Sequence, residues 1–273
     1  MNILTFLESF TNENLMNSKG SRRNSFSQFQ KIGKDFALAS IPFGLGAMAL
    51  APEKARAQSS AGTPISALKL ALTLEYLEDE FYRLGLESGV IPPGGRDEKV
   101  FMQIAKHEKA HVEFLIAGLG PSNFVEKPTF DFTVGGAFDP FNQNGAGQAT
   151  AYAQFMALAQ AFEDTGVRAY KGQAANLISS PSLLTAALQI HSVEARHASE
   201  VRRLRGLRGW IQGNQRGAGM PEATQAVYNG EEVTSQAGYN TATLFGADAG
   251  SEAYDEPLSG DQAVAIASLF IVS

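Results

Sequence analysis

The most constraining feature of this sequence is an arrangement of glutamate, tyrosine and histidine that occurs twice. In "LEYLEDEFY" (74–82) a glutamate precedes a tyrosine by seven residues, and "FEDTGVRAY" (162–170) repeats that spacing. Each copy is followed by a Glu-x-x-His sequence, in "KHEKAH" (106–111) and in "HSVEARH" (191–197). Residues three or seven positions apart share one face of an α-helix, so the repeat predicts helices that direct these side chains to a common interior. The repeated residues are Glu75, Tyr82, Glu108, His111, Glu163, Tyr170, Glu194 and His197.

Helical periodicity and its stop signals predict an all-α fold. Thr63 and Pro64 form a helix N-cap with a first-turn proline, and glycine or proline ends each apolar run. The predicted helices cover residues 63–89, 97–120, 148–178 and 182–210. Short connections join the helices of each pair, and a long one, 121–147, joins the pairs, with a strand or two expected around 129–134. This order predicts a four-helix bundle with one long crossover.

The chain divides into three parts by composition. Residues 1–57 are predicted to be a signal peptide, 58–210 the four-helix bundle, and 211–273 an irregular C-terminal extension. The extension is rich in Gly, Gln, Asn and Thr and shows little periodicity before 259–271, where a short last helix is expected. We expect this extension to wrap the bundle and pack on it.

The repeat supplies the donors of a dinuclear metal site. One glutamate from each of two helices, plus Glu-x-x-His from the other two, is the inward-pointing set that a dimetal-carboxylate bundle requires. The chain contains no cysteine, which excludes disulfides, thiolate ligands and a cysteine nucleophile. Carboxylates with one imidazole per metal favour two iron or two manganese ions over copper. The alternative is a bundle that has lost its metal and keeps these residues as a buried polar network.

Further residues near the repeat have less certain roles. His107 and His191 break the internal symmetry and are interpreted as supporting or surface groups rather than ligands. Tyr82 and Tyr170 either hydrogen-bond the ligand carboxylates or carry an electron, or else they are core aromatics with a satisfied hydroxyl. Glu78 lies on the same face of the first helix as Glu75 and is the alternative to Glu75 as the ligand from that helix.

The chain resembles the ferritin-like superfamily, and more closely the exported ferritin-like proteins related to plant desiccation-related proteins. The repeat segments carry the resemblance, extended as "FEDTGVRAYKGQA" (162–174) and "HSVEARHASEVR" (191–202), together with "EAYDEPLS" (252–259). It covers the chain from residue 63 to the C-terminus. The resemblance implies that Glu75 and Glu163 are terminal ligands and that Glu108 and Glu194 bridge the two metals. It also implies that His111 and His197 each bind one metal.

The ligand pattern does not specify one reaction, because ferritins, rubrerythrins and manganese catalases share variants of it. One function is a di-iron or di-manganese oxidoreductase of the ferroxidase, peroxidase or catalase type, acting on dioxygen or hydrogen peroxide in oxidative or desiccation stress. Another is iron binding or storage. The third is a structural or stress-protective protein that works without bound metal.

The first part of the chain resembles an export signal. "SRRNSF" (21–26) is similar to a twin-arginine signal, 36–51 is an apolar run, and "ARA" (55–57) supplies the small residues of a cleavage site. The apolar run is short for a membrane span, which disfavours the alternative of an uncleaved anchor. Cleavage removes the run, so no stable span is expected in the mature protein. The formal net charge of −6 argues against nucleic-acid partners. A homo-oligomer is compatible with the sequence. We therefore expect an acidic protein exported to the periplasm or the extracellular space.

If Arg22 and Arg23 direct export and the leader is removed after Ala57, the mature protein begins at or near Gln58. Intact-mass spectrometry of native protein from the exported fraction measures this directly. A chain that retains Met1 and stays in the cytoplasmic fraction would contradict the predicted localisation.

Overall fold

A computed structural model describes residues 62–272 of the chain. The predicted signal peptide, 1–57, lies outside these residues. Among the helices that are described, none combines the length and the apolar character needed to cross a membrane.

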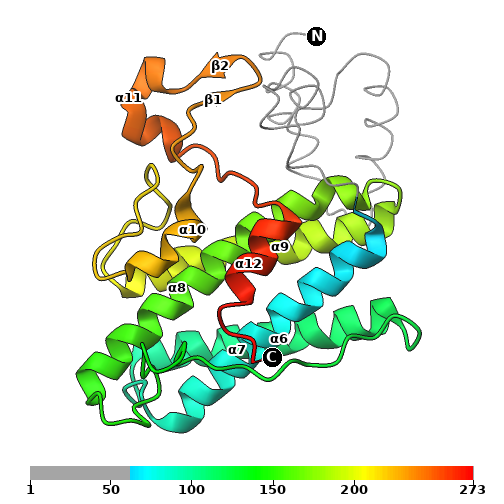
Figure 1. Ribbon diagram of the computed structural model, residues 1–273. Coiled ribbons are helices and arrows are strands. Elements are labelled where there is room, and N and C mark those ends of the chain that lie inside the picture. The colour runs from blue at the N-terminus through cyan, green and yellow to red at the C-terminus, as the bar shows by residue number, and fades with distance from the viewer. Residues whose placement is uncertain (1–61, 273) are drawn as a thin grey trace, which may run out of the picture. The chain divides into compact units, whose positions relative to one another are not determined.

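Four long helices form a bundle, as the sequence predicts (Figure 1). The helices are α6 (Pro64–Ser88), α7 (Arg96–Leu119), α8 (Gln148–Gln173) and α9 (Pro181–Leu204). Thr63 caps α6 through a reciprocal pair of hydrogen bonds with Ser66, and Gly89 ends it with a positive φ of 72°. The short turns after α6 and α8 bring α6 against α7 and α8 against α9 as two helical hairpins (Figure 1).

Two helix ends differ from the prediction. α8 stops at Gln173 and continues as one 3₁₀ turn, η1 (Ala174–Leu177). α9 stops at Leu204 rather than at residue 210, because Gly206 adopts a positive φ of 72°. The amides of Gly206 and Leu207 then donate to the carbonyls of Arg203 and Arg202, which closes the helix with a Schellman motif.

The long connection between the hairpins is the crossover, and the strand expected around 129–134 does not form. Within the described residues this segment makes one isolated antiparallel bridge, between Phe130 and Ile271. The amide of Asp131 donates to the carbonyl of Phe270 at 2.8 Å beside it. The crossover is held to the bundle by aromatic packing instead of by a sheet.

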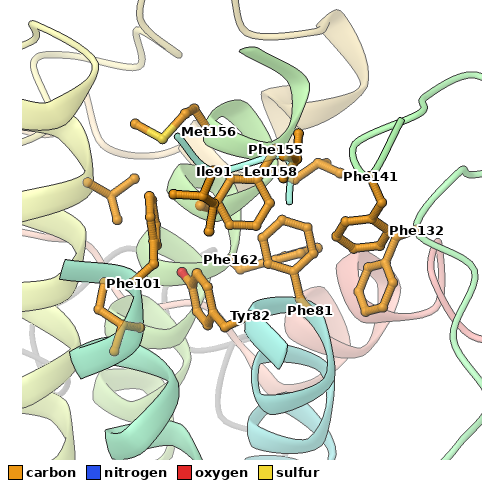
Figure 2. Close-up of a cluster of buried hydrophobic side chains, with 14 of the residues drawn as sticks. Phe81, Tyr82, Ile91, Phe101, Phe132, Phe141, Phe155, Met156, Leu158 and Phe162 are labelled. Atoms are coloured by element: carbon orange, nitrogen blue, oxygen red, sulfur yellow. The ribbon is translucent and has the colours of Figure 1, made fainter. Parts of the chain in front are cut away.

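That packing is centred on Phe81, which is fully buried (Figure 2). Its ring lies 5.3 Å from the ring of Phe132 and 5.6 Å from that of Phe141, both in the crossover. From α8, Phe155 stacks on it at 4.8 Å and Phe162 meets it edge-on at 4.9 Å. Aromatic pairs at these separations contribute about 0.5–1.5 kcal/mol each beyond the area they bury. The cluster fixes the crossover against both hairpins.

The C-terminal extension packs on the bundle through short elements. It contains η2 (Glu222–Thr224), α10 (Gln225–Tyr228), β1 (Ser235–Gln236), β2 (Tyr239–Asn240), α11 (Ala242–Ser251) and α12 (Gly260–Ala267). β1 and β2 pair antiparallel as a small hairpin. α12 lies across α6 and α8, where Ala263 and Ala267 pack against Leu74 and Ala169 (Figure 1).

Arg168 of α8 binds the extension through a buried side chain. Its Nε lies 2.7 Å from a carboxylate oxygen of Glu231 and donates to the carbonyl of Glu256 at 2.7 Å. Its Nη2 donates to the carbonyl of Asn229 at 3.0 Å, and its own carbonyl accepts from the amide of Leu258 at 3.0 Å. One guanidinium therefore joins separate parts of the extension to the central helix.

Replacing Arg168 with alanine is expected to destabilise the protein by about 3 kcal/mol or more, because it leaves the carboxylate of Glu231 buried without its cation. Urea unfolding measures the loss, and limited proteolysis should show faster cleavage between residues 211 and 258. Arg83→Ala is the control, since Arg83 pairs with Glu80 and Glu87 on the surface and should cost about 0.5 kcal/mol. Equal stability of the two variants would contradict this role of Arg168.

Candidate metal centre

The bundle interior brings together the residues that the sequence repeat singles out. Their ligand atoms form two groups, and within each group the atoms lie within 4.8 Å of one another. The first group is Glu75, Glu108, His111 and Glu194, and the second is Glu108, Glu163, Glu194 and His197. Glu108 and Glu194 belong to both groups. Two adjacent cations that shared two carboxylates would require this arrangement of donors.

In the first group the imidazole of His111 faces three carboxylates. Its Nδ1 lies 3.0 Å from Oε2 of Glu108, 3.2 Å from Oε2 of Glu75 and 3.3 Å from Oε1 of Glu194. These residues come from α6, α7 and α9. The i, i+3 spacing places Glu108 and His111 on one face of α7, which explains why both reach the same point.

The second group has the same composition, but three of its residues come from the α8–α9 hairpin and one, Glu108, from the α6–α7 hairpin. Nδ1 of His197 lies 2.9 Å from Oε1 of Glu108, 3.3 Å from Oε2 of Glu163 and 3.9 Å from Oε1 of Glu194. The internal repeat of the sequence thus becomes an approximate two-fold arrangement in space, in which each hairpin supplies one glutamate and one Glu-x-x-His.

The two tyrosines of the repeat contact the centre crosswise. The hydroxyl of Tyr82 on α6 donates to Oε1 of Glu163 on α8 at 2.5 Å. The hydroxyl of Tyr170 on α8 donates to Oε1 of Glu75 on α6 at 2.5 Å. Each tyrosine therefore positions the glutamate of the other hairpin, and both hydroxyls are satisfied. The sequence offered a contact with ligand carboxylates as one alternative but did not indicate this exchange.

Several donor atoms of the cluster are buried and lack a hydrogen-bond partner within residues 62–272. They are Oε1 of Glu108, Oε2 of Glu163, both carboxylate oxygens of Glu194, and Nδ1 of His197. All four glutamates of the repeat have no exposed surface. Buried polar atoms are nearly always paired, and Nδ1 of His197 faces carboxylates without the geometry of a hydrogen bond. Donor atoms that converge without bonding one another fit a cation, so the residues present suit a metal pair.

The pKa values in the cluster follow from burial and from contacts between charges. Burial raises the pKa of Glu75 to about 8, and burial together with the charge of Glu108 raises the pKa of Glu194 well above its ordinary value. Burial also opposes ionisation of Glu108, but contacts with His111 and His197 outweigh it and lower its pKa to about 2. Burial lowers an imidazole pKa, yet the neighbouring carboxylates raise that of His111 to about 12 and that of His197 to about 11. Free of metal, the cluster retains protons at pH 7.

The other two histidines lie beside the ligand set. Nδ1 of His107 is 2.8 Å from Nε2 of His197, and the two rings stack at 5.1 Å. His107 thus supports the outer edge of a candidate ligand ring. His191 is partly buried, and burial lowers its pKa. Its Nδ1 is buried without a partner among the described residues, and it belongs to neither group of ligand atoms.

A buried ion pair next to the centre was not anticipated from the sequence. Arg202 of α9 binds Asp164 of α8 through two hydrogen bonds of 2.6 and 3.1 Å. The hydroxyl of Tyr228, from the extension, donates to the same carboxylate at 2.8 Å. Asp164 follows Glu163 directly in α8. By holding Asp164, this network restricts rotation of the helix and so helps to keep Glu163 directed toward the centre. The sequence leaves Asp164 either solvated or salt-bridged and does not identify Arg202 or Tyr228 as its partners.

Comparison with protein families agrees with the four-helix bundle. The family described as the ferritin-like domain matches residues 63–207, which is more than half of the chain. No curated protein and no solved structure matches. The chain belongs to the ferritin-like family, and the matched segment contains all four bundle helices.

Binding of divalent metal to the centre is expected to release protons, because His111 and His197 have raised pKa values and hold protons at pH 7 that a metal must displace. Affinity should therefore fall as the pH is lowered, by about tenfold per pH unit for each proton released. Calorimetry in two buffers of different ionisation enthalpy counts the protons. A binding enthalpy that does not depend on the buffer would contradict the expectation.

Proposed function

We propose that this member of the ferritin-like family binds two iron or two manganese ions between α6, α7, α8 and α9 and uses them for redox chemistry with dioxygen or peroxide. The observation that carries the proposal is that Glu108 and Glu194 belong to both groups of ligand atoms. Shared carboxylates are what hold two cations side by side, about 3.5–4 Å apart.

Charge and donor type support this choice of metals. The four glutamates of the repeat bring four negative charges into an interior where unpaired charge is costly, and two divalent cations balance that number. The donors are carboxylate oxygens and imidazole nitrogens, and the chain has no thiolate to offer. Hard oxygen donors with one imidazole per metal suit iron and manganese.

When bound, such ions would supply the electrons exchanged with dioxygen or peroxide. The protein's part is to hold the ligands and to exclude water. Tyr82 fixes Glu163 by its hydroxyl and packs its ring on Phe101 at 5.8 Å and on Phe81 at 5.4 Å, within the aromatic cluster (Figure 2). Tyr170 fixes Glu75 in the same way. Both phenols contact ligand carboxylates, so either could carry an electron to or from the centre.

We further propose that the protein works outside the cytoplasm, in protection against oxidative or desiccation stress. This part rests on the leader pattern and on the resemblance to exported ferritin-like proteins. Iron storage and a metal-free protective role are the competing functions, and metal analysis separates them.

The test is elemental analysis of native protein purified without added metal. About two Fe or Mn per chain are expected, and Glu194→Ala should remove most of them, because it deletes a carboxylate that both positions share. His191→Ala is the control and should retain the metal, since His191 lies outside both groups of donors.

The reduced, loaded protein should then be oxidised by dioxygen or peroxide, followed by its absorption spectrum. Wild-type protein that contains no metal and takes none up would refute the redox proposal and favour the structural role. Many iron ions per chain would favour storage.

A further inference from the structure

The two-fold arrangement of the centre is broken at one position. The repeat aligns Glu75 with Glu163 and Tyr82 with Tyr170. Three residues after each glutamate, on the same helix face, the first copy has Glu78 whereas the second has a glycine, Gly166. A glutamate and a glycine thus occupy equivalent places on facing helices of the bundle.

The glycine leaves the space that the additional glutamate uses. A Cβ atom at Gly166 would lie 2.9 Å from Oε2 of Glu194 and 3.4 Å from Oε1 of Glu78. The first distance is shorter than real Cβ contacts, so any side chain at this position would push the Glu194 carboxylate away. The carboxylates of Glu78 and Glu194 therefore approach each other over the surface of Gly166.

Glu78 is buried beside the donor set, although it belongs to neither group of ligand atoms. Only 3% of its surface is exposed, and no hydrogen-bond or ion-pair partner for it is found in the described part of the chain. Both oxygens of Glu194 beside it are also buried and unpaired. A buried carboxylate with no donor and with a second carboxylate nearby is stable only with a cation or a proton beside it.

A small cavity of about 10 Å³ lies next to Glu78. It is bounded by α6, α8 and the C-terminal segment, and its lining includes Gly166, Thr165, Phe162, Ile266 and Phe270. Apart from Glu78 and Thr165, the side chains around it are apolar. Glu78 thus faces the side of the centre that α12 covers, where the second copy of the repeat offers no carboxylate.

We propose that Glu78 is a fifth carboxylate donor to the metal pair, and that Gly166 is the residue that admits it. This inference rests on the proposed function. Five carboxylates exceed by one the charge of two divalent ions, so Glu78 favours the centre after it has lost an electron. It also makes the two metal positions unequal, because only the first copy of the repeat supplies it.

The experiment is a redox titration of the metal-loaded protein, monitored by its absorption and electron paramagnetic resonance spectra. Glu78→Gln keeps the size of the side chain and removes its charge. We expect its reduction potential to rise, so that at a fixed potential the ratio of oxidised to reduced centre falls by at least about tenfold. Glu80→Gln is the matched control, because it removes a charge from the same helix at a position that pairs with Lys127 and Arg83 outside the centre. It should leave the potential unchanged.

A second variant separates ligation from a structural role. Glu78→Ala should raise the potential similarly, and added formate, a small carboxylate that fits the vacated space, should lower it again. Formate should not affect the wild type. A Glu78→Gln potential equal to that of the wild type, or no response of Glu78→Ala to formate, would overturn the assignment. If the wild type binds two metal ions in either of these cases, only the role of Glu78 fails; if it binds none, the proposed function fails first.

Discussion

Repulsion between buried carboxylates is the constraint on which this structure depends. Five glutamates, Glu75, Glu78, Glu108, Glu163 and Glu194, are buried in one bundle interior. Within residues 62–272, two imidazoles and two phenol hydroxyls contact four of these glutamates and leave several oxygens unpaired. Such a set is tolerable only if cations or protons enter it, and only if four helices keep their axial positions closely enough for the same atoms to meet.

The rest of the fold maintains those positions, and α8 shows how. Every residue of α8 from Phe155 to Tyr170 is buried. A helix that is covered on all sides needs partners on all sides. One face of α8 supplies Glu163 and Tyr170 to the centre, while Arg168 holds the C-terminal extension. The aromatic cluster around Phe81 packs near its beginning. The extension is therefore part of the frame of the bundle.

Much of this was predictable because the ligands repeat with helical spacing. The all-α bundle, its crossover and the family follow from the pattern, and the structure brings the six proposed ligands together, although their metal-binding role stays a prediction. Most features that escaped prediction depend on contacts distant in sequence, such as the bridge of Phe130 to Ile271 near the C-terminus. The early end of α9 is a local exception, because Gly206 closes the helix two residues after Leu204. The sequence leaves Asp164 either solvated or salt-bridged, and only the structure identifies Arg202 and Tyr228 as its partners. Periodicity reports which face a residue occupies but not which partner it meets there.

The crossed tyrosines carry a consequence for how such a chain can be divided. Each helical hairpin provides the hydroxyl for the other hairpin's glutamate, and each contributes a shared carboxylate to both cation positions. The hairpins therefore relate to each other as the subunits of a symmetric dimer do, with one self-complementary interface joined into a single polypeptide. Neither half is self-sufficient: separated at the crossover, each would keep the helix contacts within its own hairpin, lose those to the other hairpin, and retain only half of the donor set. Because both hairpins belong to one polypeptide, they stay together and their sequences can differ at equivalent positions. Glu78 in the first copy of the repeat and Gly166 in the second are such a difference.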